Sequence, residues 1–302
     1  MKLIKPSFTI IEQQAGLEGI YKQIEMAGRT CYKSEDKITE TSAKEFVDRM
    51  IKSGHGAMLE HGTVYLAIPM TTYAPDAVNK YRDNAYSKVN DCDEFIFTDK
   101  YGDEVAAWCV TTNLRVLVEN DCLEDLEFLC KPTEYHERRY TVKFICDRGV
   151  SHEFVRHRVF SFAQESTRYC NYSKDKFNNE ITFIIPCWMD DSQVGHHDTG
   201  DIINQAYNFL PVECNPGEYE EILFMDIMAK AEFNYNELIK KGWKAQEARA
   251  ILPNSLKTEL VMTGFVSDWK HFFELRDAKS AHPQALELAS PLHQEFLTRG
   301  YL

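Results

Sequence analysis

Residues 140–162 read YTVKFICDRGVSHEFVRHRVFSF, and this stretch decides how the fold is interpreted. Its first part, Tyr140–Asp147, is rich in β-branched and aromatic residues and predicts a strand that ends at Arg148-Gly149. From Gly149 to Phe162 the apolar side chains recur at helical spacing, so a helix is expected there.

Similar patterns predict strands and helices on both sides of this stretch. We expect an edge strand at 3–12, further strands at 64–69, 104–112 and 181–186, and helices at 16–32, 41–54, 113–129, 219–241, 244–250, roughly 267–276 and 283–298. The sequence has no regular strand–helix alternation, no Gly-x-Gly-x-x-Gly motif, no repeat and no Pro/Gly/Ser linker. It therefore predicts a single α+β domain over residues 1–302, with an elaboration near 71–139.

The composition is that of an ordinary globular protein with an acidic balance. Of the 302 residues, 44% are hydrophobic and 27% are charged, which excludes low-complexity and disordered classes. The formal net charge of -13 argues against a general nucleic-acid binder and against an anionic-membrane binder, because both need a basic surface.

The nine cysteines are widely spaced and odd in number, with no Cys-x-x-Cys pair. This pattern is typical of reduced thiols rather than of a disulfide framework or a zinc site. Residues 1–14 lack the features of a secretion signal, and nowhere do eighteen apolar residues follow one another. A cytoplasmic protein that does not span a membrane is expected.

The charge reverses sign in one segment. Residues 138–168 contain seven basic residues, six of them Arg, against three acidic ones, so this segment is +4 and the remainder of the chain is -17. Arginine pairs two-to-two with phosphate or carboxylate, so the segment suits small anions.

The expected helix places Arg158 four residues from both Phe154 and Phe162, inside an apolar stripe. A guanidinium in that position is costly unless an anion meets it. The alternative to an anion site is a helix whose charged side chains form salt bridges at the surface and at interfaces. The run SFAQESTRY at 161–169 adds hydroxyl and amide donors, which together suit a phosphate, a sugar and the edge of a heterocycle.

Other chemical interpretations of the same stretch are weaker. His152 and His157 are five residues apart with Arg156 between them, whereas two zinc-binding histidines on one helix face stand four apart, so no metal site is expected. Residues 195–198, GHHD, are interpreted as a polar loop. Ser166 and Cys170 are both candidate nucleophiles, but neither lies in a nucleophile-elbow pattern, and Cys170 is interpreted as a bystander thiol.

Arg156-His157-Arg158, followed by seven residues and then Ser166, resembles the signature of the flavin-dependent thymidylate synthases. Further segments are similar to stretches of that family: 60–63 (EHGT), 249–253 (RAILP), 271–276 (HFFELR) and 281–284 (AHPQ). The resemblance covers residues from about 27 to 290 and leaves 71–139 as an insertion relative to compact members.

The resemblance implies a fold, an activity and a set of ligands. Such enzymes have a mostly antiparallel sheet flanked by helices, and they methylate dUMP to dTMP. The methylene comes from 5,10-methylenetetrahydrofolate, and the hydride passes from NADPH through FAD. They are homotetramers whose sites are shared between subunits.

The resemblance also implies residue roles. The residues expected to contact FAD are His61, Thr63, Arg156, His157, Arg158, Gln164 and His271. Those expected to bind dUMP are Glu153, Arg156, Gln164, Glu165, Ser166, Thr167, Arg168, Arg249 and Arg276, with Arg168 and Arg249 on the phosphate. Arg276 would favour ionisation of uracil N3 by stabilising negative charge on the pyrimidine, and Ser166 would act as a positioned donor rather than a covalent nucleophile.

Two other functional classes remain beside the enzyme. One is a catalytically silent relative that binds the nucleotide without turnover. The other is an RNA- or DNA-binding protein that uses the Arg-rich segment, against which the -17 surroundings speak.

Overall fold

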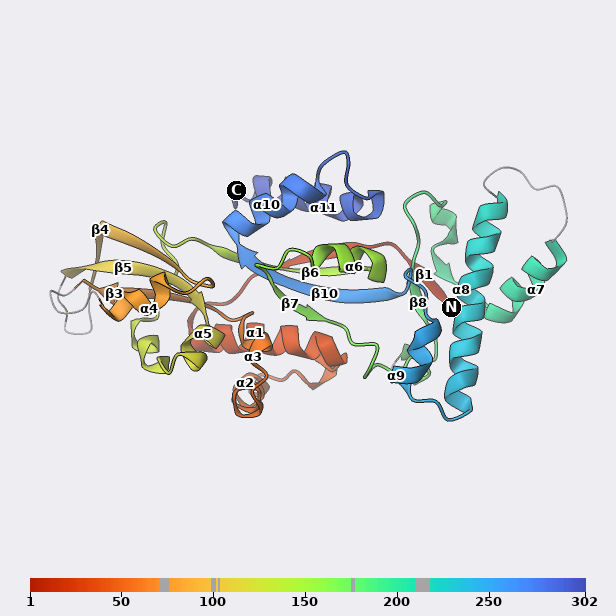
Figure 1. Cartoon of the computed structure of the whole chain (residues 1–302), viewed down its shortest axis with the longest axis horizontal. Coiled ribbons are helices and arrows are strands. Elements are labelled where there is room, and N and C mark those ends of the chain that lie inside the picture. The colour runs from red at the N-terminus through yellow and green to blue at the C-terminus, as the bar shows by residue number, and fades with distance from the viewer. Residues whose placement is uncertain (71–75, 99–101, 103, 175–176, 210–217) are drawn as a thin grey trace.

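Three β-sheets lie one after another along the molecule, with helices packed against them (Figure 1). The computed structural model describes residues 1–70, 76–98, 102, 104–174, 177–209 and 218–302. The strands are β1 (Lys2–Ile4), β2 (Ser7–Ile11), β3 (Thr63–Pro69), β4 (Lys88–Thr98), β5 (Glu104–Asn113), β6 (Arg139–Asp147), β7 (Ser161–Gln164), β8 (Thr182–Ile184), β9 (Gly195–His196) and β10 (Lys257–Phe265).

The helices alternate irregularly with the strands. The α-helices are α1 (Gly16–Tyr32), α2 (Ser42–Ser53), α3 (Gly56–Leu59), α4 (Asp76–Arg82), α5 (Leu114–Glu119), α6 (Arg148–Phe154), α7 (Thr199–Phe209), α8 (Glu218–Lys240), α9 (Ala245–Ala248), α10 (Val266–Arg276) and α11 (Pro283–Thr298). The 3-10 helices are η1 (Glu35–Lys37), η2 (Leu123–Phe128), η4 (Asp191–Gln193) and η5 (Arg249–Ile251). No helix in the described part of the chain is both long enough and apolar enough to cross a membrane.

The central sheet has four antiparallel strands in the order β2-β6-β10-β7. One face packs against α6, α10 and α11 through an aromatic core, in which the ring centroids of Phe154 and Phe272 are 5.1 Å apart. On the other face, Val261 of β10 and Ala163 of β7 pack against Ala27 of α1. The predicted α+β fold with a mostly antiparallel sheet flanked by helices is confirmed.

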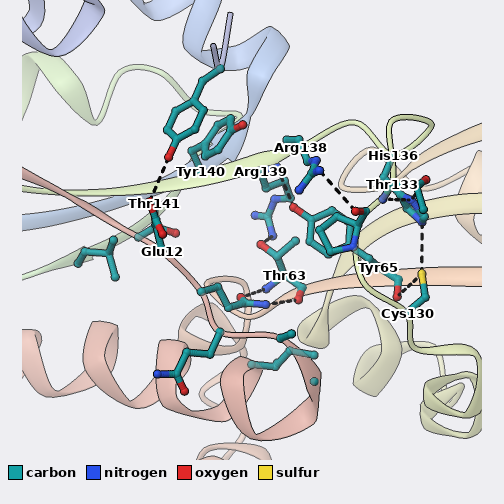
Figure 2. A pocket seen from close by; sticks show the side chains of 18 of the residues that line it. Glu12, Thr63, Tyr65, Cys130, Thr133, His136, Arg138, Arg139, Tyr140 and Thr141 are labelled. Atoms are coloured by element: carbon teal, nitrogen blue, oxygen red, sulfur yellow. Dashed lines mark hydrogen bonds between the residues drawn. The ribbon is translucent and has the colours of Figure 1, made fainter. Parts of the chain in front are cut away.

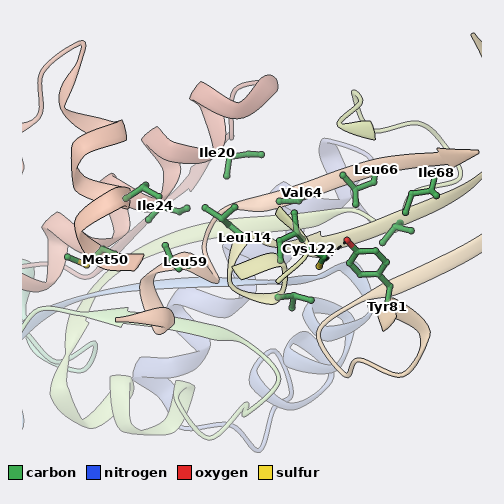
Figure 3. Packing of buried hydrophobic residues seen from close by; sticks show 14 of the residues in the cluster. Ile20, Ile24, Met50, Leu59, Val64, Leu66, Ile68, Tyr81, Leu114 and Cys122 are labelled. Atoms are coloured by element: carbon green, nitrogen blue, oxygen red, sulfur yellow. Dashed lines mark hydrogen bonds between the residues drawn. The ribbon is translucent and has the colours of Figure 1, made fainter. Parts of the chain in front are cut away.

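The mid-chain sheet has the order β3-β5-β4 and is also antiparallel. Its apolar side chains join those of α1 and α2 in one core, seen in Figure 3, where Ile20 and Ile24 of α1 approach Val64 of β3. Segment 71–139, expected as an insertion, supplies β4, β5, α4, α5 and η2, and β3 before it completes the sheet. Its residues 71–75, 99–101 and 103 lie outside the described part.

The third sheet, β8-β1-β9, combines one parallel and one antiparallel pairing and packs against α8. The strand expected at 3–12 is thus two strands, β1 and β2, which pair in different sheets on either side of Pro6. Proline lacks the amide hydrogen that a sheet ladder needs, which explains the break.

The helix expected from Gly149 to Phe162 is wrong beyond Phe154. The side chain of Asp147 caps the start of α6 by accepting a hydrogen bond from the Val150 amide at 2.8 Å. After a short turn the chain becomes β7, which pairs with β10. Arg158 therefore lies in an exposed turn and not on the apolar stripe of a helix.

Several described elements were not predicted, among them α3, α4, β4, α7 and the interior strand β10, as well as β9, whose residues 195–196 were expected to belong to a polar loop. The helix expected at 113–129 is divided into α5 and η2 around Asp121, whose φ is +52°. The one expected at 244–250 is the short pair α9 and η5. Seven described cysteine side chains are free thiols, while Cys214 and the side chain of Cys92 lie outside the described part.

Candidate active site

Arg276 is the last residue of α10. Its side chain is held by the end of α6 and by the turn that follows α6. Its Nη1 donates to Glu153 Oε2 at 2.5 Å and its Nη2 donates to the Glu153 carbonyl at 2.8 Å. Its Nε donates to His157 Nε2 at 3.0 Å. All three donor nitrogens are thus engaged, so the direction of the guanidinium is fixed.

His157 is a neutral imidazole in this arrangement. Burial, together with the positive charge of Arg276, lowers the pKa of His157 to about 4. Because Nε2 accepts the bond from Arg276, the ring hydrogen lies on Nδ1. Its ring also packs 5.1 Å from that of Phe272, so His157 is both a partner of Arg276 and part of the apolar core.

Three exposed residues, His271, Arg156 and Arg158, complete a first group of predicted site residues. His271 lies on α10 with its ring 6.1 Å from that of His157. Arg156 and Arg158 are exposed on the turn after α6, and no described residue forms an ion pair with either guanidinium. The first group consists of Glu153, Arg156, His157, Arg158, His271 and Arg276.

A second group gathers where the chain leaves β7 beside the end of α1. The Ser166 amide donates to the Cys31 carbonyl at 3.0 Å, and the Arg168 amide donates to Ser166 Oγ at 3.3 Å. Arg249 of η5 donates from Nη1 to Thr167 Oγ1 at 3.1 Å. The structure therefore brings Ser166, Thr167, Arg168 and Arg249 together, although 82 positions separate Thr167 from Arg249.

A cavity of about 440 Å³ lies beside the second group, between α1, α2 and α3. Its lining includes Cys31 and Tyr32, and Tyr32 packs 5.1 Å from Tyr169 in the Ser166 loop. His55 and Arg115 also line it. Neither was predicted from the sequence, where the local signal was the histidine between two glycines at 54–56.

Gln164 and Glu165 are bound internally rather than free for a ligand. Gln164 Nε2 donates to Ser151 Oγ at 2.8 Å. Glu165 is 2% exposed, and its carboxylate accepts hydrogen bonds from Lys257 at 2.7 Å and from Tyr172 at 3.2 Å. Because the carboxylate of Glu165 is buried and already paired with Lys257, its position does not support the expected contact with dUMP.

His61 and Thr63, the two residues expected near FAD at the start of β3, lie in the interior. His61 is fully buried, with Nδ1 2.8 Å from Thr263 Oγ1. Thr63 is clamped by Gln13, which donates to its carbonyl and accepts from its amide, both at 2.8 Å. Neither residue lines the 440 Å³ cavity, so their positions do not support contact with a cofactor there.

The two groups lie toward opposite faces of the central sheet. The first belongs to the face that α6, α10 and α11 cover, and the second lies next to α1 on the other face (Figure 1). Within the described part of the chain, no hydrogen bond or ion pair joins a residue of the first group to one of the second. One copy of the chain therefore presents two separate sets of polar side chains.

Among the described residues there is no group of three or more His, Cys, Asp and Glu side chains arranged to hold a metal ion. His152 is exposed, and His196 lies 2.7 Å from Glu180, which also pairs with the N-terminal ammonium of Met1.

The model of the family described as "Thymidylate synthase complementing protein" matches residues 133–298, more than half of the chain. The chain belongs to this family. The matching region contains both groups of polar residues and the central strands β6, β7 and β10, but not the mid-chain sheet before residue 133.

Relatives named "Flavin-dependent thymidylate synthase" are similar to this member of the thymidylate synthase complementing protein family. The protein from Pyrococcus furiosus is 30% identical over 154 residues, 51% of this chain and 52% of its own length. The protein from Mycobacterium tuberculosis is 30% identical over 142 residues (47% and 50%), and that from Corynebacterium aurimucosum is 32% identical over 142 residues (47% and 51%). The chain thus spans about half the length of the curated relatives it matches.

A solved structure described as a UMP/dUMP methylase PolB from Streptomyces cacaoi bound with 5-Br dUMP was also found. It covers 99% of this chain and 93% of its own, with 15% sequence identity and a TM-score of 0.41. A TM-score at this level does not establish that this chain and the methylase share a fold.

Proposed function

We propose that this chain is a flavin-dependent thymidylate synthase that converts dUMP to dTMP. In this proposal FAD is the cofactor, 5,10-methylenetetrahydrofolate donates the methylene group and NADPH supplies the reducing equivalents. Membership of the family supports it, as do the names of the relatives. The observation that carries it is the fixed guanidinium of Arg276, the arrangement expected of a group that stabilises charge on a pyrimidine.

Arg276 is proposed to favour the ionised pyrimidine. Negative charge at N3 raises the nucleophilicity of the ring carbon that is methylated, and a fixed cation beside N3 stabilises that charge in the transition state. Because Glu153 and His157 already orient the guanidinium, little reorganisation is needed when the substrate arrives. The neutral state of His157 matters, since a protonated imidazole could not accept the bond from Arg276.

The second group is proposed to bind the nucleotide phosphate. Arg168 is exposed, and Arg249 approaches the same loop through Thr167. A planar guanidinium pairs with two phosphate oxygens at once, so two arginines are well suited to hold a dianionic phosphate. Ser166, whose Oγ already accepts the Arg168 amide, positions the nucleotide without forming a covalent bond.

The residues present fit a flavin. The guanidiniums of Arg156 and Arg158 are exposed, and no described residue neutralises them, so they can stabilise an anionic reduced ring or a pyrophosphate. The 440 Å³ cavity beside the Ser166 loop, whose lining includes Tyr32 and Met58, offers space for a planar ring. When bound, the flavin supplies the hydride. His271, 6.1 Å from His157, is proposed as a further contact.

The separation of the two groups supports a homotetramer with shared sites. Arg276 and Arg249 must both act on the same dUMP molecule, Arg276 on the pyrimidine and Arg249 on the phosphate. In one copy, however, these two residues lie toward opposite faces of the central sheet. We propose that a second copy brings its own group to complete the site, and that residues 1–302 act as one domain in the cytoplasm.

The test is an absorbance spectrum of the purified protein followed by an assay for dTMP with dUMP, methylenetetrahydrofolate and NADPH. We expect FAD absorbance and dTMP formation, and Arg276→Lys should lose turnover while it retains its fold and its FAD. A protein that binds dUMP but makes no dTMP would be the catalytically silent relative. A protein that neither takes up FAD nor binds dUMP would overturn the proposal.

A further inference from the structure

A second cavity, of about 620 Å³, lies where the mid-chain sheet meets the central sheet and the last residues of the chain (Figure 2). Its lining comes from β2 and the turn after it, from β3, from the loop 129–136, from the start of β6 and from 299–301. Thr63 is the one residue of the sequence-predicted site that lines it. The cavity is thus built largely by the mid-chain segment and the chain's two ends.

The cavity is bordered by a buried cation that forms no ion pair with a carboxylate of the described residues. Arg139 is 9% exposed, and its side chain donates only to neutral acceptors: the Glu60 carbonyl at 3.1 Å, Thr63 Oγ1 at 3.3 Å and Ser161 Oγ at 3.3 Å. Its Nε has no hydrogen-bond partner. Burial lowers the pKa of Arg139 to about 10, which reflects the cost of a desolvated charge.

A second cation stands at the mouth of the same cavity. Arg138 is exposed, and its described hydrogen bond is a long one, 3.4 Å from Nη2 to the Pro132 carbonyl. The other charged pair in the lining is internally neutral, because Arg299 donates to Glu12 at 3.1 Å. Glu134 is the remaining carboxylate, so the two arginines leave the cavity with a positive balance.

An aromatic wall lies beside these cations. Tyr140 of β6 stacks on Tyr301, with ring centroids 4.0 Å apart and an interplanar angle of 16°. Tyr65 and His136 form an edge contact at 5.5 Å on the mid-chain side. Figure 2 shows Tyr140, Arg138 and Arg139 around one space. Flat aromatic faces beside a guanidinium are well suited to a planar ring that carries an anionic group.

We propose that this cavity binds a small ring compound that carries a phosphate or carboxylate group. Arg138 holds the anionic group directly, and the buried charge of Arg139 adds a favourable field behind it. The ring lies against the Tyr140–Tyr301 stack. The site is separate from the proposed catalytic residues and does not depend on the proposed activity.

Calorimetric titration of the full chain with phenyl phosphate, benzoate and phenol tests this proposal. Phenyl phosphate and benzoate distinguish the two anionic groups, and phenol keeps the ring without the anion. We expect at least one of the two anions to bind, and Arg138→Ala to weaken it by about tenfold or more, as loss of a charged hydrogen bond does. Tyr301→Ala should weaken it as well, while phenol should bind far more weakly than the preferred anion.

Two matched controls locate the binding. Arg49→Ala removes an exposed arginine of α2 that does not line this cavity, and it should leave the affinity unchanged. Arg249→Ala removes a cation of the proposed phosphate site and should also leave it unchanged. Addition of excess dUMP or FAD should not displace the probe.

Three results would overturn the proposal: no binding of either anion, equal binding to the wild type and Arg138→Ala, or displacement by dUMP together with loss of binding in Arg249→Ala. The last would assign the probe to the nucleotide site. Arg138 is exposed, so its replacement is expected to leave the fold intact, and a circular dichroism spectrum verifies this.

Discussion

Arg276 illustrates how a single side chain receives its direction from two neighbours that are four residues apart. Glu153 lies on α6 and His157 on the turn after it, so the end of α6 presents a carboxylate, a carbonyl and an imidazole nitrogen to one guanidinium. Sequence resemblance predicted the identities of these residues. That they contact one another, and that His157 is neutral, became visible only in the structure.

Ser166 and Cys170 provide a test of whether the reaction uses a positioned serine hydroxyl or a cysteine nucleophile. Cys170 is 2% exposed in the core beside α8, whereas Ser166 lies in the loop that contacts Arg168. We expect Ser166→Ala to lower the rate of dTMP formation by about tenfold or more, because a positioned hydrogen bond is lost. Cys170→Ser should retain turnover, with some loss of thermal stability. The reverse order in the rate assay would indicate a cysteine nucleophile.

His61 makes the stability of the protein depend on pH. Burial lowers its pKa to about 3 in the folded chain, whereas in the unfolded chain it titrates near 6.5. Between these values the unfolded chain binds one more proton, so this contribution to stability is present above pH 6.5 and is lost as the pH falls through that window.

The expected slope from His61 is about 1.4 kcal/mol per pH unit below 6.5. Urea unfolding of the wild type and of His61→Gln at several pH values in this window measures it, and the variant should show the shallower dependence. His152→Gln, at an exposed position, should keep the wild-type slope. Equal slopes for the wild type and His61→Gln would refute the assignment.

At the scale of elements, β10 and β7 show where local pattern and tertiary structure disagree. Residues 159–163 form a short, mostly apolar run, which by itself fits either a buried strand or a continuation of the helix after α6. Pairing with β10 decides the outcome, since the register places Ser161 opposite Thr263 and Gln164 opposite Leu260. Because β10 itself was not predicted, the partner that selects the strand was missing from the sequence argument.

Gly264 near the end of β10 tests that packing. A Cβ atom at this position would lie 2.6 Å from Cδ1 of the Phe160 ring, which is itself buried against Trp269 at a centroid distance of 4.7 Å. Gly264→Ala should therefore lower the free energy of unfolding by about 1–3 kcal/mol, as overpacking of a core does. Urea denaturation measures this loss.

The matched control for Gly264 is the double variant with Phe160→Leu, whose smaller side chain leaves room for the new methyl group. The two changes should be less than additive, by about 1 kcal/mol in a double-mutant cycle. Strict additivity would mean that the methyl group does not meet Phe160.

At the scale of the whole molecule, the arrangement of two polar groups toward opposite faces of the central sheet predicts complementation between copies. Arg276→Lys and Arg249→Ala should each have little activity alone. If each site takes Arg276 from one copy and Arg249 from another, random co-assembly of the two variants restores about a quarter of the wild-type activity.

Co-expression of the two variants followed by the dTMP assay measures this restoration, with a parallel determination of mass by light scattering. Separate expression and mixing without subunit exchange serves as the control and should show no restoration. A tetramer that shows no complementation would place the whole site within one copy.

Local sequence pattern predicted the fold class and the boundaries of α1, β6 and α11 to within a residue or two, and the family resemblance predicted the motif residues of both polar groups. Short segments carry both kinds of signal. Long-range contacts determine that α6 ends at Phe154, that β10 is an interior strand beside β6, and that Glu165 and His61 are buried and paired. The physical reason is that strand pairing, burial and ion pairing depend on partners far away in the chain, such as Lys257 for Glu165 and Thr263 for His61.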